Sequence, residues 1–172
     1  MSRKFKMNSY DWLEYRLSQF WDSFPPLPAL RDEADVAARA LALTHAITAA
    51  AAIKLRESRP DAGSRLAQGK RVAAARGILA SLGAFHSANV HPIVGSLYSI
   101  ACHVLLEEIR AAREFREVWA ESLGQRMSPP ASDEDRLVAD LRDGLVTMAV
   151  YAAESSFIAH KFNVLMQYYA SM

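Results

Sequence analysis

Long stretches of this 172-residue chain repeat apolar residues every three or four positions, and this spacing constrains the fold more than any other feature. Such a repeat places the apolar side chains on one face of an α-helix. The longest repeat lies near the C-terminus, and its members are Val138, Leu141, Leu145, Met148, Ala152, Ser155, Ala159, Phe162, Met166 and Tyr169. Glycines and prolines number only seven each, and long β-branched runs, which favour strands, are lacking. The sequence therefore predicts an all-α protein.

Capping and turn residues divide the chain into five predicted helices. A proline-rich segment over residues 25–28 ends the first helix, Ser64 is a candidate N-cap for the third, and Pro92 suits the first turn of the fourth. The length suits one domain, and short connections between long helices favour antiparallel neighbours. We therefore expect residues 1–172 to form a single bundle of about five antiparallel helices. The predicted helices span residues 9–24, 33–57, 64–87, 92–123 and 133–170.

The charge balance and cysteine content narrow the class of partner. The chain contains 20 basic and 19 acidic residues, so it lacks the net positive charge that is typical of a nucleic-acid-binding domain. The single cysteine excludes an intramolecular disulfide and favours a reducing, intracellular compartment. The most apolar stretch, residues 40–53, is too short to span a bilayer and carries polar residues, so it predicts a buried helix. We expect neither a nucleic-acid nor a membrane partner.

Catalytic and metal-binding motifs are missing from the sequence. It contains no Gly-x-Ser-x-Gly nucleophile elbow and no Glu-x-x-His pair of the kind that builds di-iron helical bundles. His103 and Glu107 share a helix face, but a second such pair is lacking. We therefore expect no enzymatic activity, no metal and no cofactor.

Five polar or reactive side chains remain as candidates for the lining of a pocket between the second, fourth and fifth predicted helices. Polar groups on otherwise apolar helices are typical of small-molecule sites in bundles, although most such groups are ordinary core residues. This alternative makes the chain a stand-alone helical small-molecule-binding protein or a helical enzyme. The candidate pocket residues are His45, Tyr98, Cys102, His103 and Tyr151.

Three stretches of the chain, taken together, carry a resemblance to a known family. The first joins a Pro-Pro-Leu-Pro segment to alanine-rich helical sequence, the second is Ala-Ala-Ala-Arg-Gly-Ile-Leu, and the third begins at a His-Pro pair. They resemble the C-terminal part of the helical regulatory region of fungal zinc-cluster transcription factors, especially the basidiomycete type. The matching segments are residues 25–28, 40–46, 49–55, 73–79, 91–98 and 101–109.

The resemblance implies a regulatory, effector-responsive helical module of a nuclear activator. The six-cysteine DNA-binding cluster of that family is absent from this sequence, so we expect no direct DNA binding by this chain. Such a module would work by helix packing against a protein partner, against a second copy of itself, or around a small apolar effector. The family has no effector-binding motif that assigns individual residues here.

Overall fold

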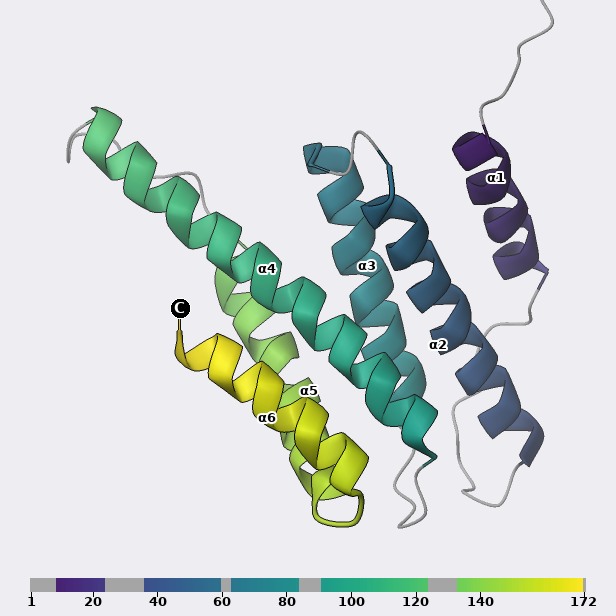
Figure 1. The fold of residues 1–172 in the computed structure, drawn as a ribbon. Coiled ribbons are helices and arrows are strands. Elements are labelled where there is room, and N and C mark those ends of the chain that lie inside the picture. Colours follow the sequence, from purple (N-terminus) through teal and green to yellow (C-terminus); the bar gives the residue numbers. More distant parts are fainter. Residues whose placement is uncertain (1–8, 24–35, 60–62, 84–90, 124–132, 172) are drawn as a thin grey trace, which may run out of the picture.

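The structure is a computed structural model, and it describes residues 9–23, 36–59, 63–83, 91–123 and 133–171 (Figure 1). These residues form six α-helices and contain no strand, which confirms the all-α prediction. The helices are α1 (Ser9–Asp22), α2 (Val36–Glu57), α3 (Arg65–Leu82), α4 (Pro92–Leu123), α5 (Glu134–Ala152) and α6 (Ser156–Ala170).

The predicted helix over residues 133–170 is wrong at one point, because the chain turns back at residues 153–155 and forms two helices. Ser155 has extended backbone angles (φ −135°, ψ 113°), and its hydroxyl accepts a hydrogen bond from the backbone N–H of Ile158 at 3.4 Å. This is the geometry of a helix N-cap. The apolar spacing continues across the turn because α5 and α6 bury their apolar faces in the same core.

The other four predicted helices correspond to α1–α4, but two end earlier than predicted, because Ser23 and Gly83 already lie in turns. Ser64 caps α3 as predicted, with its hydroxyl accepting from the backbone N–H of Ala67 at 3.2 Å. Helix α3 ends at Leu82, with Gly83 as its C-cap, and α4 begins at Pro92. The remaining predicted helical residues, 24, 33–35 and 84–87, lie outside the described residues.

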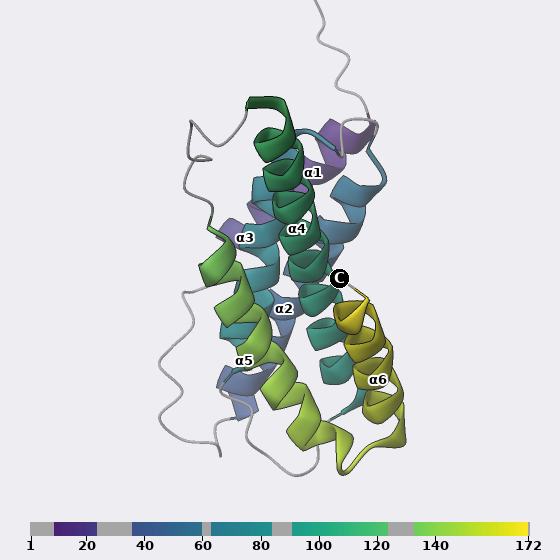
Figure 2. The same cartoon turned by 90° about the vertical axis from the view of Figure 1, so that its left-hand side faces the viewer.

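Helix α4 is the longest helix and occupies the centre of the bundle. It contacts α3 and α2 on one side and α5 and α6 on the other (Figures 1 and 2). Helices that follow one another from α2 onward run in opposite directions, as expected. Helix α1 lies outermost against α2, so the rest of the bundle separates it from α5 and α6.

The core follows α4 along most of its length. Large side chains of α4 such as Leu105, Leu106 and Ile109 are fully buried. Each contributes roughly 1.5–3 kcal/mol of hydrophobic stabilisation relative to an exposed position. Two glycines allow neighbouring helices to approach closely: Gly95 of α4 against α6, and Gly144 of α5 against α4 and α3. A Cβ atom at either position would lie within 3 Å of a neighbouring side chain.

Helices α2 and α4 are long and apolar enough to cross a membrane when judged by length and composition alone. In the bundle, 44% of the most apolar window of α2 and 56% of that of α4 are buried inside the protein. A core helix of a water-soluble bundle has the same composition, so this property is weak evidence for a membrane segment.

Candidate functional site

Three of the five predicted pocket residues come together, but they lie inside the core. Tyr98, Cys102 and Tyr151 are at most 5% exposed, and the centroids of the two tyrosine rings are 6.0 Å apart. Burial raises the pKa of the Cys102 thiol to about 12, and burial together with the neighbouring Tyr151 raises the pKa of Tyr98. Both groups are therefore neutral near pH 7, which suits core residues better than reactive ones.

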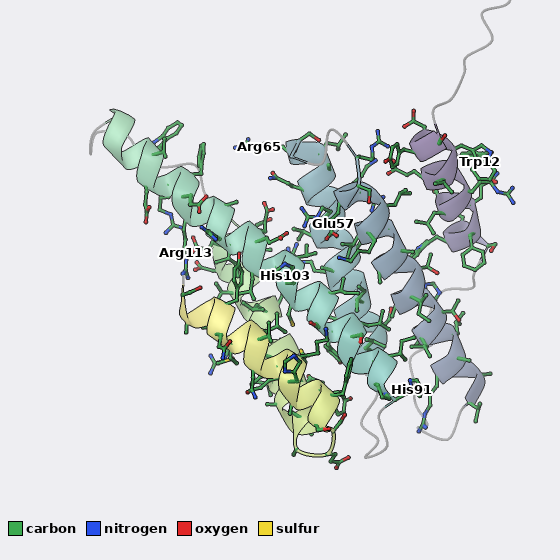
Figure 3. The ribbon with its side chains drawn as sticks, in the orientation of Figure 1. Trp12, Glu57, Arg65, His91, His103 and Arg113 are labelled. Carbon is green, nitrogen blue, oxygen red and sulfur yellow. The ribbon has the colours of Figure 1, made fainter. Side chains whose placement is uncertain are left out.

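The two histidines lie apart from that group and from each other. His45 of α2 is buried, and its ring packs edge-on against Trp21 of α1 with centroids 5.0 Å apart. His103 lies on the exposed side of α4, 3.3 Å from Glu107 and 5.6 Å from the ring of Tyr168 (Figure 3). The structure therefore does not gather the five predicted residues around one cavity. No group of three or more histidine, cysteine, aspartate or glutamate side chains is placed to hold a metal among the described residues.

A groove of about 600 Å³ lies elsewhere, between α1, α2 and α3, and we call it the α1 groove. Its floor consists of small residues from α2 and α3, and its α1 wall includes Leu17 and Trp21. This volume lies within the range of small-molecule sites in proteins. The floor residues are Thr48, Ala49, Ala52, Ala73, Ala74 and Gly77.

The small floor residues create the groove because they leave space beneath α1. A Cβ atom built on Gly77 would meet only the tip of the Trp21 ring, at 4.0 Å, which is ordinary van der Waals contact. Ala49 and Ala52 are almost fully buried against the neighbouring helix, so α2 and α3 pack tightly below the floor. Larger side chains at these positions would fill the space that α1 spans.

A cluster of charged side chains closes one end of the groove, and we call it the Glu14 cluster. One carboxylate oxygen of Glu14 accepts hydrogen bonds from Arg56 Nε and Nη2, at 3.3 and 3.1 Å, and from Lys70 Nζ at 3.3 Å. The other oxygen accepts from Arg59 Nη1 at 2.8 Å, and Arg59 also pairs with Asp11 at 3.1 Å. The cluster therefore joins α1 to the end of α2 and to α3.

The cluster sets the electrostatics of the site. Burial of Glu14 acts to raise the pKa of its carboxyl group, but the hydrogen bonds and charges of Lys70 and Arg56 outweigh burial. The pKa therefore lies below its ordinary value of 4.5. Among the described residues, the side chains of Arg56, Arg59 and Lys70 pair with the carboxylates of Glu14 and Asp11.

Helix α1 rests on the bundle without burying any residue. Trp21 is only partly buried against the core, while Trp12, Tyr15 and Phe20 are about half exposed. Figure 3 places Trp12 on the outer side of α1, away from α2. The described contacts of α1 include the Glu14 cluster and the packing of Trp21 on His45 and on the core.

A second groove, of about 480 Å³, lies between α5 and α6 on the opposite side of the bundle. Its lining is apolar apart from Arg142. Val146 is 60% exposed on this face, and Met166 and Tyr169 are each 38% exposed. Exposed apolar side chains that gather on one face are typical of protein–protein contact surfaces.

Sequence reasoning missed the α1 groove. Two signals pointed toward it: the alanine run at residues 49–52, which predicts a close helix approach, and the small residues Ala73, Ala74 and Gly77. The pairing of Glu14 with Arg56 joins residues 42 positions apart, and no local spacing rule finds such a pair. The groove combines a floor of small residues with charged side chains at one end, an arrangement suited to binding a small molecule.

Comparisons of this chain with protein-family models, with curated proteins and with solved structures gave no match.

Proposed function

We propose that this chain is a non-enzymatic, effector-responsive regulatory domain, and that the α1 groove is the site where a small apolar effector binds. The observation that carries the proposal is a helix with no buried residue lying over an apolar groove of about 600 Å³. Because α1 buries no residue of its own, moving it costs little hydrophobic burial compared with moving a core helix. Effector binding would then change the position or the order of α1.

This proposal agrees with the resemblance to the regulatory region of fungal zinc-cluster activators, which also implies a nuclear location. The outermost position of α1 supports it, since α1 can respond while α2–α6 keep their packing. A six-cysteine zinc cluster encoded in frame upstream of Met1 would support membership in that class of protein. A continuous transcript that lacks such a cluster would argue against it.

The effector site is tested by a thermal-shift screen of small apolar compounds on three proteins. The wild type is compared with Ala73→Leu, which fills the groove, and with Ala139→Leu, which adds the same bulk at a position of α5 outside both large grooves. A ligand that binds only the folded state raises the melting temperature. We expect stabilising compounds to act on the wild type and on Ala139→Leu but not on Ala73→Leu. Equal stabilisation of all three proteins, or of none, would refute the site.

The exposed apolar groove between α5 and α6 favours a second function, contact with another copy of this chain. An antiparallel helix pair can dock on a second such pair to form a four-helix bundle. We expect light scattering to show a dimer for the wild type, and a monomer for Val146→Lys, which places a charge on this face. The control Val36→Lys alters a side chain that is 77% exposed on α2 and should leave the dimer intact. A monomeric wild type would refute this second function.

A further inference from the structure

The charges at the end of the α1 groove specify the class of effector more narrowly than its apolar lining does. Resting on the proposed function of the groove as an effector site, we propose that the preferred ligand is an amphipathic monocarboxylate. Its apolar body would lie on the alanine floor, and its carboxylate would bind Lys70 at the Glu14 cluster.

Lys70 is the cation that can accept a ligand, because its pairing is the least complete in the cluster. Arg56 directs two N–H groups at Glu14 and is only 16% exposed, and Arg59 contacts both Glu14 and Asp11. The Lys70 ammonium meets a single carboxylate oxygen, at 3.3 Å, and its side chain is 48% exposed. An ammonium group has three N–H donors, so two remain for a ligand.

The position of Lys70 matches the shape of such a ligand. Lys70 lines the α1 groove, and the next residues of α3 that line it are Ala73, Ala74 and Gly77 of its floor. A cation thus stands at one end of a strip of small residues, which is complementary to a molecule with one anionic end and an apolar body. The Lys70 ammonium disfavours a cationic ligand, and a neutral ligand would leave its two remaining N–H donors without an ionic partner.

Glu14 would stay in place when the ligand binds. Its two oxygens already accept hydrogen bonds from Arg56 and Arg59, and the low pKa of its carboxyl group keeps it ionised near pH 7. The ligand carboxylate would therefore bind Lys70 beside Glu14. Ligand binding at Lys70 would then affect α1 through Glu14, the side chain that joins this helix to α2 and α3.

The test compares two probes with the same apolar chain, decanoate and decanol, titrated calorimetrically into the full-length protein below the concentration at which either aggregates. We expect decanoate to bind about fivefold more tightly than decanol, as a partly exposed ion pair allows. Lys70→Gln should remove this preference and leave decanol binding unchanged. Lys54→Gln is the matched control, since Lys54 lies on α2 outside the α1 groove and is 62% exposed.

The possible outcomes separate this inference from the proposed function. If decanoate and decanol bind the wild type equally and Ala73→Leu abolishes the binding of both, the carboxylate preference is wrong. The groove then remains an apolar effector site. A decanoate preference that survives in Lys70→Gln overturns the role of Lys70. Failure of both probes to bind, or equal binding to the wild type and to Ala73→Leu, overturns the inference and the effector site together.

Discussion

Replacing Gly95 by alanine tests the packing of α6 on α4, which shapes the half of the bundle opposite α1. A Cβ atom at Gly95 would lie 2.5 Å from Cγ1, 3.0 Å from Cδ1 and 3.4 Å from Cβ of Ile158. Carbon atoms in contact normally lie about 3.5–4.0 Å apart, so the closest overlap is about 1 Å. Ile158 is fully buried and β-branched, and it therefore has little freedom to move aside.

The expected free-energy change combines two opposing terms. Overpacking a core contact costs about 1–3 kcal/mol, while alanine in place of glycine stabilises a helix interior by about 1 kcal/mol. We expect Gly95→Ala to lower the free energy of unfolding by about 1 kcal/mol. Gly69→Ala is the control, because Gly69 lies in α3 and a Cβ atom added there would have no neighbour within 4 Å, so this change should raise that free energy by about 0.5–1 kcal/mol.

Urea denaturation followed by circular dichroism measures both values. The predicted gap of about 2 kcal/mol corresponds to about 4–8 °C in melting temperature for a chain of this size. Ile158→Ala completes a double-mutant cycle with Gly95→Ala, and we expect the double variant to be more stable than the sum of the single effects by about 0.5–3 kcal/mol. If Gly95→Ala proved as stabilising as Gly69→Ala, the close approach of α4 and α6 would be wrong.

Three further predictions concern the buried thiol, the turn before α6 and the Glu14 cluster. Burial raises the pKa of the Cys102 thiol from 9.0 to about 12, so its thiolate fraction near pH 7 falls about a thousandfold. We therefore expect a thiol reagent to label Cys102 only when urea unfolds the chain. Rapid labelling of the native protein would contradict its burial. Ser155→Ala should lower the free energy of unfolding by about 1 kcal/mol through loss of the α6 cap, whereas an unchanged urea midpoint would argue against the cap. A carboxyl group whose pKa is lowered by folding stabilises the folded state above its ordinary pKa and loses this effect as the pH falls through the lowered value. After correction for the intrinsic exchange rate, hydrogen exchange of the α1 amide groups should therefore accelerate as the pH falls below 4.5. The Glu14→Gln variant should lack this acceleration.

The helical class and most helix boundaries follow from the sequence, because they depend on local spacing and capping. Ser64 is recognisable as a cap, since it stands directly after a turn-forming segment with a glycine. Ser155 performs the same role without such a signal, because the apolar spacing continues through it without a glycine or a proline. A pattern of apolar residues reports which side chains are buried, and it gives no direct sign of a chain that reverses while facing the same core.

The candidate site could be predicted only in part, for a different physical reason. The sequence indicates that Tyr98 and Cys102 share an apolar helix, but burial in a closed core and the lining of a pocket produce the same local pattern. The α1 groove depends on where α1 docks, and the ion pairs of Glu14 with Arg56 and Lys70 fix that position across 42 and 56 residues. Pairings over such distances depend on the tertiary arrangement, which local spacing does not determine.

The central claim is that α1 is a separable cover over an effector groove, and native-state hydrogen exchange of the full-length protein tests it most directly. Amide groups of α1 should exchange through local openings with a free energy well below that of the core helix α4, because α1 buries no residue. Ala73→Leu should increase the exchange of α1 further and leave the exchange of α4 unchanged. If α1 exchanged as slowly as α4, and only through global unfolding, α1 would be an integral part of the core and the account would be wrong.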